Sequence, residues 1–344
     1  MSEPKDIALG GARASSSGVK KSRPWAGALL GVSILTLVLP VGFGTSISLM
    51  TMFSAVFFYL ALAQGWNLLG GLGGYLNFAT ALFAGVGAYT AAWLHNQFEL
   101  TLWQTILPGA IAAAVISLLV GYATLRLRSH YFAIFTLILT FLGAVVVKNM
   151  PALGGGAGIF LDLEGEWTSE SIAQFYFFCF LALAVVATII AFFVQHSNFG
   201  YALIAISEDE TAAQVLGVRT MDVKLRALFI GSALGGAAGA IFAFFTSYIE
   251  PGGIFNLDIA LDVILVCVIG GMRSWLGPVI GAFVVVFLEQ SLRLLIPSLS
   301  VFGMELPTET GRLILGALLV VFALFFRRGI VGIFQSRRGR NLSV

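Results

Sequence analysis

The sequence predicts an all-α fold: a polytopic integral membrane protein with about ten transmembrane helices and both chain ends in the cytoplasm. Three observations lead to this prediction. Hydrophobic residues make up 58% of the chain and charged residues only 10%, whereas a soluble domain is roughly 25% charged. Apolar stretches of membrane-spanning length recur along the sequence, and the basic residues fall on alternate sides of them. The composition therefore excludes an ordinary soluble domain.

The apolar stretches set the predicted elements. Most are close to the ~20 residues that a helix needs to cross a hydrocarbon core ~30 Å thick. The eighth stretch is short and has acidic residues near its start, so a re-entrant or broken segment stays open there as an alternative to a full crossing. The predicted crossings are residues 25–43, 47–69, 75–94, 103–125, 131–147, 172–194, 227–248, 259–271, 277–296 and 312–326.

The Lys and Arg residues predict the orientation, because cytoplasmic loops of membrane proteins carry an excess of them. With the N-terminus inside and the helices alternating, all but three of the 19 basic residues fall on the cytoplasmic side. The exceptions are Lys148, Arg293 and Arg312. The acidic residues between 162 and 170 then lie outside, and a second acidic group at 208–210 lies inside.

The two ends are predicted to be cytoplasmic tails. Residues 1–24 are polar, basic and rich in Ser and Gly, which is typical of disorder. A signal peptide is the alternative, but the apolar run that follows is longer than a usual h-region and has no clean small-residue cleavage pattern. We therefore predict a transmembrane permease domain at 25–326, which contains a cytoplasmic loop at 195–226, and a basic tail at 327–344.

The sequence has no motif for enzymatic chemistry. It contains no GxxxxGK(S/T) loop for a nucleotide, no HExxH and no GxSxG. His95, His130 and His196 stand apart without metal-ligand spacing, and Cys179 and Cys267 lie in apolar spans. We predict no catalytic residue, no metal site and no disulfide framework. Energy for uphill transport would have to come from a partner or an ion gradient.

Small and polar residues within the spans predict packing faces and a transport pathway. Gly231, Gly235 and Gly239 recur every fourth residue, a spacing that lets helix backbones approach closely in lipid. Polar side chains at membrane depth are costly and usually face a cavity or a partner. For the acidic residue among them, simple pairing with a neighbouring helix is an equal alternative. The candidate pathway residues are Asn67, Asn77, Thr80, Tyr89, Thr136 and Asp262.

The stretch "AISEDETAAQVLGVRT", residues 205–220, predicts a short capped helix at 208–216 in the cytoplasmic loop. Ser207 and Glu210 fit a capping box, Glu208 and Asp209 suit the first turn of a helix, and Gly217 suits the left-handed position after its end.

In that helix, Ala212, Ala213 and Leu216 would share a face that another surface can approach, and the acidic residues would meet basic groups of a cytosolic partner. A well-capped loop helix needs no partner, however. The helix signals alone leave two functions open: a permease driven by a docked ATPase, or a self-contained secondary transporter or channel.

Four motifs carry a family resemblance. The pattern EDExAAxxLG, from Glu208 to Gly217, resembles the coupling-loop region of the LivM-type permeases of branched-chain amino-acid ABC importers. "GWNLLGGLGGYLNFATALFAGVGAY", "LRLRSHYFAIFTL" and "LDVILVCVIGGMRSWLGPVIGA" resemble further stretches of that family, in the family's order, over roughly residues 65–290. Ser207 stands where the family often has Arg. The resemblance assigns ATPase coupling to Ser207, Glu208, Asp209, Glu210, Ala212, Ala213, Leu216 and Gly217.

The resemblance implies a bacterial inner-membrane subunit that forms a heterodimer with a sister permease. It also implies two cytosolic ABC ATPases, an external solute-binding protein, and ATP and Mg used by those ATPases, with no cofactor on this chain and no nucleic acid. The implied cargo is branched-chain amino acids. Urea or short-chain amides are the alternative, because Asn77, Ala79 and Thr80 stand where relatives commonly show Ser, Gly and His, and Arg273 replaces the third Gly of the GGxG signature.

Overall fold

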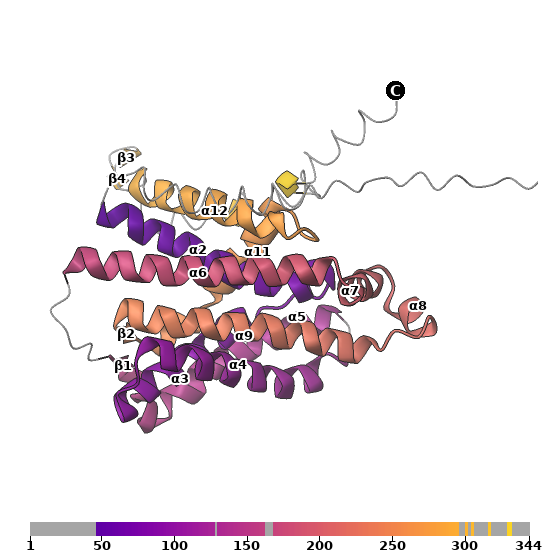
Figure 1. The fold of residues 1–344 in the computed structure, drawn as a ribbon, viewed down its shortest axis with the longest axis horizontal. Helices are drawn as coiled ribbons and strands as arrows, with labels where there is room; N and C mark the ends of the chain where they lie inside the picture. Colours follow the sequence, from indigo (N-terminus) through magenta and orange to yellow (C-terminus); the bar gives the residue numbers. More distant parts are fainter. Residues whose placement is uncertain are drawn as a thin grey trace, which may run out of the picture. The chain divides into compact units, whose positions relative to one another are not determined.

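The structure, a computed structural model, describes residues 46–127, 129–161, 168–295, 300–301, 304–305, 316–317 and 329–331. The predicted crossing at 25–43, nearly all of the one at 312–326, both predicted tails apart from 329–331, and the acidic residues between 162 and 167 lie outside these residues. The elements are α2 (Ile47–Asn67), η1 (Leu68–Leu72), α3 (Thr80–Phe98), α4 (Leu102–Thr124), α5 (Ser129–Lys148), η2 (Pro151–Leu153), η3 (Gly155–Ala157), β1 (Ile159–Phe160), α6 (Ser169–Gln195), α7 (Asn198–Glu208), α8 (Glu210–Val215), α9 (Thr220–Thr246), β2 (Tyr248–Ile249), α10 (Pro251–Ile254), α11 (Leu257–Gly270), α12 (Leu276–Leu295), β3 (Ser300–Val301) and β4 (Met304–Glu305) (Figure 1).

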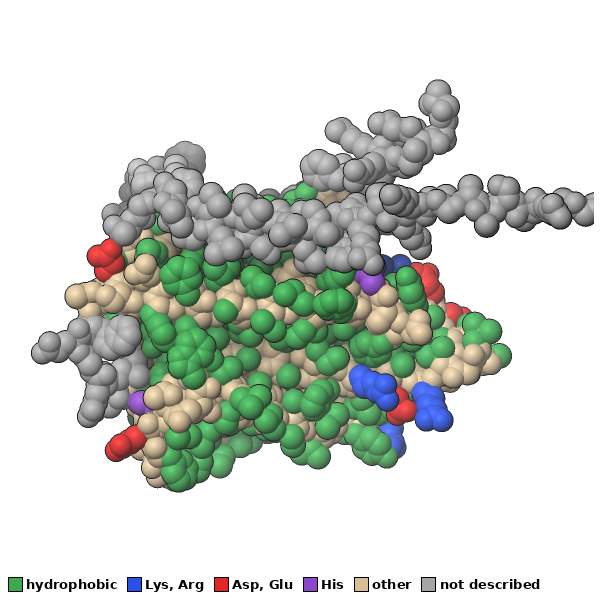
Figure 2. All heavy atoms as spheres, viewed as in Figure 1, with side chains coloured by type: hydrophobic (Ala, Val, Ile, Leu, Met, Phe, Trp, Pro, Cys, Tyr) green, Lys and Arg blue, Asp and Glu red, His purple; other side chains and the backbone are tan. Residues whose placement is uncertain are grey.

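Within the described residues, 6 candidate spans are long and apolar enough to cross a membrane. They are Ile47–Leu72, which joins α2 and η1, then α4, most of α5, α6, α9, and Pro251–Gly270, which joins α10 and α11. Hydrophobic side chains cover most of the face seen in Figure 2, and the charged side chains lie towards the helix ends. This distribution is that of a multi-pass membrane protein, and the count of about ten crossings stays a prediction.

The structure differs from the sequence prediction in the connection between the second and third crossings. The α-helix α2 passes into a π-helical turn, η1, and residues 73–79 are irregular before α3 starts at Thr80. Gly74 has φ +74°, a left-handed conformation that glycine adopts without a Cβ penalty. The glycine-rich sequence thus separates the two helices, and the break extends to Thr80, five residues beyond the predicted start of the third crossing.

Helix α9 lies at the centre of the packing. It packs against α3 and α4 and also contacts α2, while α2 packs on α6 and α11 packs on α12 (Figure 1). A Cβ on Gly231 would meet the carbonyl oxygen of Gly65, and one on Gly239 would overlap the carbonyl oxygen of Ala84. The nearest atom to a Cβ on Gly235 would be 3.5 Å away, in ordinary contact. Gly231 and Gly239 therefore lie where the backbone of α9 contacts the backbone of a neighbouring helix in this subunit.

Helices α4 and α5 are the least enclosed of the candidate spans. Only 28% of the α4 window and 22% of the α5 window are buried inside the chain, against 67% for α9. Their outer faces carry large aliphatic and aromatic side chains, such as Leu119 and Tyr131. These two faces are therefore the ones left for lipid or for another subunit.

Candidate functional site

The loop at 195–226 forms two helices, α7 and α8, where the sequence predicts one. Helix α7 runs through Ser207 to Glu208, and Asp209, with extended φ −155°, separates it from α8. Asp209 Oδ1 accepts a hydrogen bond from the Ala212 N–H at 2.9 Å, so Asp209 is the N-cap. The Ser207 hydroxyl donates instead to the Ile204 carbonyl. The predicted capping box of Ser207 and Glu210, and the helix start at 208, are wrong because Ser207 still belongs to the last turn of α7.

The far end of α8 follows the sequence prediction. Gly217 has φ +89°, and its N–H donates to the Gln214 carbonyl at 2.9 Å while the Val218 N–H donates to the Ala213 carbonyl at 3.0 Å. These two bonds are the Schellman pattern, which satisfies carbonyls at a helix end. The sharp stop leaves Val215 84% exposed and Leu216 83% exposed at the tip of the loop.

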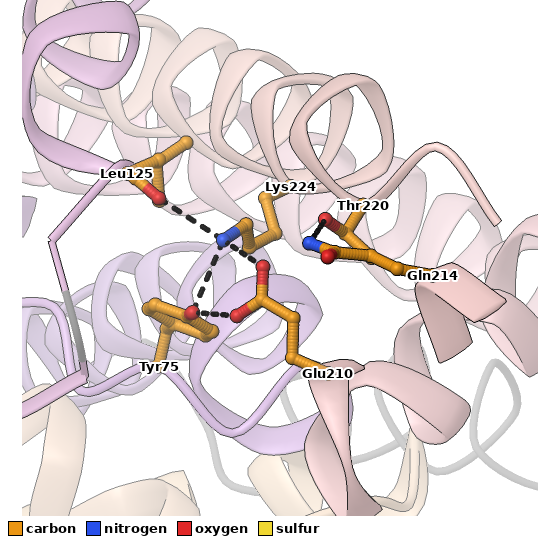
Figure 3. A network of polar contacts seen from close by, with 6 residues as sticks. All are labelled: Tyr75, Leu125, Glu210, Gln214, Thr220 and Lys224. Carbon is orange, nitrogen blue, oxygen red and sulfur yellow. Dashed lines mark hydrogen bonds and ion pairs between the residues drawn. The ribbon is translucent and has the colours of Figure 1, made fainter. Parts of the chain in front are cut away.

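The base of α8 is fixed by a polar network that centres on Lys224 of α9 (Figure 3). Lys224 Nζ donates to Glu210 Oε1 at 2.6 Å, to the Tyr75 hydroxyl oxygen at 3.0 Å and to the Leu125 carbonyl at 3.0 Å. An ammonium group has three N–H donors, so each is used. The Tyr75 hydroxyl in turn donates to Glu210 Oε2. Every polar atom at the centre of the network therefore has a partner.

Burial makes this network strong. The Lys224 side chain is 3% exposed and that of Glu210 is 29% exposed, and the Lys224 ammonium also lies 4.5 Å from the centre of the Tyr75 ring. Burial alone would raise the pKa of Glu210, but the hydrogen bonds from Lys224 and Tyr75, together with the Lys224 charge, outweigh burial and lower the pKa of Glu210. Burial first, and then the bond to Glu210, raise the pKa of Tyr75. At neutral pH Glu210 is an anion and Tyr75 a neutral donor.

The network connects four segments of the chain at one point. Glu210 is in α8, Lys224 is in the second turn of α9, Tyr75 is in the irregular segment 73–79, and Leu125 follows the last turn of α4 (Figure 3). A displacement of α8 would therefore pull on the break between α2 and α3 and on the ends of α4 and α9. Such an arrangement can transmit movement from α8 to the ends of the long helices.

A second ion pair holds the end of α7. Arg273, in the connection between α11 and α12, places Nη1 2.6 Å from Glu208 Oε1, and its Nη2 donates to the Ser207 hydroxyl at 3.3 Å. The side chains of Arg273 and Glu208 are 51% and 65% exposed. Solvent screens such a pair, so it contributes much less than the buried network.

The acidic residues of the loop thus serve the chain itself. Glu208 and Glu210 pair with Arg273 and Lys224 of the same chain, and their contact with basic groups of a partner stays a prediction. Ala213 is buried, so it does not share a docking face with Ala212 and Leu216. The exposed apolar side chains of this segment are those of Ala212, Val215 and Leu216, and the polar Thr211 and Gln214 are exposed beside them. Sequence reasoning missed Tyr75 and Val215. Lys224 is one of three basic residues, with Arg219 and Arg226, near the start of an apolar helix, and nothing in that pattern distinguishes it from the other two.

Four of the candidate pathway residues lie around the break between α2 and α3. Asn67 Nδ2 donates to the Ser274 carbonyl at 3.2 Å, and Asn77 Oδ1 accepts from the Ala79 N–H at 2.9 Å. Thr136 Oγ1, on α5, accepts from the N–H of Phe78 at 3.1 Å. Thr80 is the first residue of α3. Thr136 and Asn77 therefore hydrogen-bond within the region of the irregular segment, whereas Asn67 bonds to the connection between α11 and α12.

The other two pathway residues lie elsewhere. The Tyr89 hydroxyl donates to the Ile249 carbonyl at 3.4 Å, and Tyr89 lines a cavity of about 420 Å³ between α3, α4 and α5 whose walls are mostly aliphatic and aromatic. Asp262, on α11, accepts from the Tyr59 hydroxyl at 3.1 Å. The structure therefore does not gather the six residues into one site. Among the described residues, no group of three or more His, Cys, Asp or Glu could hold a metal ion.

The sequence matches known membrane transport proteins over most of its length. Residues 26–323 match the family described as branched-chain amino acid transport system / permease component. The chain is 26% identical over 326 residues to the high-affinity branched-chain amino acid transport system permease protein LivM of Escherichia coli, which covers 87% of this chain and 74% of that protein. It is 24% identical over 294 residues to the LivH permease of Salmonella typhimurium, with 80% and 91% covered. A probable LivH of Methanocaldococcus jannaschii is 23% identical over 283 residues, with 78% and 86% covered.

Proposed function

This chain belongs to the family of permease components of branched-chain amino acid transport systems, and from that premise we propose that it is the permease subunit of an ATP-driven importer in which α8 is the coupling helix. The observation that carries this proposal is the construction of α8. Its tip presents Val215 and Leu216 to solvent, while its base is tied through Glu210 to the membrane helices. A helix that is rigidly held and exposes large aliphatic side chains is suited to dock on another protein.

The exposed tip gives the proposed interface its driving force. Burying one Val or Leu side chain is worth about 1.5–3 kcal/mol, so Val215 and Leu216 together could supply a substantial part of a contact with a cytosolic ATPase. Movement of the docked ATPase would reach the segment 73–79 through Glu210 and Tyr75. The break between α2 and α3 is the part of the described chain best suited to change access, because its backbone is already irregular.

We keep ten crossings with both ends in the cytoplasm as part of this proposal. The 6 candidate spans, the further helices α3 and α12, and the stretches 25–43 and 312–326 add up to ten. Arg126, Arg219 and Arg226 are close in sequence to the network, and Arg273 contacts α7. Basic residues accumulate on the cytoplasmic side of membrane proteins, and this supports a cytoplasmic position for α8.

The proposed partners follow from the same premise. The chain matches both LivM and LivH, and we assign it the part of LivM, beside a sister permease that resembles LivH. Two cytosolic ABC ATPases would use ATP and Mg, and an external solute-binding protein would deliver the cargo. We propose branched-chain amino acids as that cargo, since the relatives are named for them. The mostly apolar cavity beside Tyr89 suits aliphatic side chains better than it suits urea.

Uptake by the reconstituted complex tests the proposal. The complex of both permeases, both ATPases and the binding protein should accumulate labelled leucine in proteoliposomes only when ATP is present. The double variant V215S/L216S should keep its thermal stability and lose ATP-driven uptake and ATPase co-purification, because both side chains are exposed in the isolated chain. The matched double variant V215I/L216M keeps apolar side chains at both positions and should transport normally.

Three results would count against specific parts of the proposal. Normal uptake by V215S/L216S would remove α8 from the coupling interface. Uptake driven by a proton or sodium gradient without any ATPase would favour a self-contained secondary transporter. Competition by urea or short-chain amides, but not by isoleucine or valine, would replace the cargo and leave the coupling mechanism intact.

A further inference from the structure

Two buried hydroxyl groups in the membrane domain have no hydrogen-bonding partner among the described residues. They belong to Thr80, the first residue of α3, and to Ser232 of α9. Thr80 is 6% exposed and Ser232 is 1% exposed. A hydroxyl buried without a hydrogen bond costs about 1–3 kcal/mol by mutational measures, so two of them at one place need a physical explanation.

Other hydroxyls in the helices of this chain satisfy themselves. The side chains of Ser54, Thr124 and Thr188 each donate to the carbonyl four residues earlier in their own helix, at distances of 2.8 to 2.9 Å. This back-bonding is the usual solution for Ser and Thr inside helices. Thr80 has no such carbonyl, because the residues before it are irregular. Ser232 lies within α9 and still does not bond back.

Both hydroxyls line the same small cavity. It lies between α2, η1, α3 and α9, with Asn77 as a third polar residue in its wall and no charged residue among those that line it. The cavity leaves about 10 Å³ open to the centre of a water-sized sphere, which is the space that one water molecule needs. A water is stable in such a place when it has two to four polar partners, and Thr80, Ser232 and Asn77 supply that number.

We propose that this cavity is a binding site for a single water molecule that bridges Thr80 of α3 and Ser232 of α9. The absence of a carboxylate from the cavity wall favours a neutral ligand over a cation, since a buried cation needs charge or several oxygen ligands. The cavity is walled by close backbone contacts, including that of Gly65 with Gly231, which leave no room for a larger molecule.

The position of the water makes it a second link between α3 and α9. Thr80 lies five residues after Tyr75, and Ser232 lies eight residues after Lys224. The water therefore lies further along the two segments that the Lys224 network already joins. A water can exchange its hydrogen bonds at little cost, because it replaces one bond by another without moving a side chain. The link would hold α3 against α9 and still permit them to shift.

Two measurements test the site. An experimental structure at a resolution that shows ordered water should contain one density peak within hydrogen-bonding distance of both hydroxyl oxygens. The absence of such a peak, in a structure that shows other buried water molecules, would overturn the proposal. The melting temperature should also be the same in sodium, potassium and choline chloride, and a specific rise in one of the metal salts would identify a cation instead of water.

A mutant cycle gives an independent test if no such structure is obtained. The variants T80V and S232A should each lower the melting temperature by a few degrees. The double variant T80V/S232A should melt no lower than the less stable single variant, because it leaves neither hydroxyl without a hydrogen bond. The control S117A removes a buried hydroxyl that donates to the Ala114 carbonyl, and its effect should add to that of S232A. Simple additivity of T80V and S232A would show that no shared water joins them.

Discussion

Removing either partner of the Glu210–Lys224 pair should have very unequal effects on stability. In Glu210→Ala the Lys224 ammonium remains, 3% exposed, with only the Tyr75 hydroxyl and the Leu125 carbonyl to face. A buried charge that loses its partner costs about 3–5 kcal/mol. In Lys224→Met the remaining Glu210 is 29% exposed and keeps the hydrogen bond from Tyr75. Water can solvate part of its carboxylate, so we expect a loss of only about 1–2 kcal/mol, the size of a charged hydrogen bond.

The double variant E210A/K224M provides the decisive comparison. Replacement of both members of a buried ion pair by apolar residues is often neutral, so this variant should be no less stable than Lys224→Met alone. The assay is the melting temperature of the detergent-solubilised protein at pH 7. The single change Glu210→Ala should lower it by on the order of 10 °C, since about 1 kcal/mol corresponds to roughly 2–4 °C in a large domain.

The chain contains its own control for this experiment. Glu208 is two residues from Glu210 and has an ion pair of the same 2.6 Å length with Arg273, but both side chains of that pair are more than half exposed. An exposed pair is worth about 0.2–1 kcal/mol, so Glu208→Ala should shift the melting temperature by no more than a few degrees. Equal losses for Glu210→Ala and Lys224→Met, with additive effects in the double variant, would refute the buried network.

The remaining predictions concern pH and packing. Because the pKa of Glu210 is lowered from its ordinary value of 4.5, its contribution is complete above that pH and is lost as the pH falls through the lowered pKa. The natural chain should therefore be more stable than Glu210→Gln by a constant amount from pH 7 to about 5, and this difference should shrink at lower pH. A difference in melting temperature that already decreases between pH 7 and 5 would contradict the lowered pKa. In α9, Gly235→Ala should be neutral or stabilising, because Ala favours a helix by about 1 kcal/mol and the new Cβ has room. Gly239→Ala should destabilise by about 1–3 kcal/mol, since its Cβ would overlap the Ala84 carbonyl, and equal melting temperatures for the two variants would contradict this packing.

The parts of the fold that depend on local sequence could be predicted. Continuous apolar runs located most of the membrane helices, and a single glycine located the end of α8 at Gly217. The start of α8 could not be predicted in the same way, because Ser207 and Asp209 are both good N-cap residues. The choice between them depends on where α7 ends, and that is decided by the packing of α7 on the rest of the chain.

The site itself depends on contacts between distant parts of the sequence. Tyr75 is 135 residues from Glu210 and 149 residues from Lys224, and no local pattern relates them. The acidic cluster suggested an outward-facing, partner-binding surface because charged residues are normally solvated. The burial of Lys224 gives Glu210 an internal partner that the sequence pattern did not indicate, since a buried ammonium requires an anion nearby.

A coupling helix has to meet two physical requirements that compete. It must bind its partner through groups that are free in the isolated chain, and it must be held firmly enough that movement of the partner is passed on and not absorbed by the loop. In α8 these requirements fall on different residues: the aliphatic side chains at the tip are exposed, and the acidic side chain at the base is locked to Lys224. If Glu210 were the docking group, a basic residue of the partner would compete with Lys224 for the same carboxylate. In the coupling role that we propose for α8, internal use of Glu210 removes that competition and leaves the contact with the partner to Val215 and Leu216.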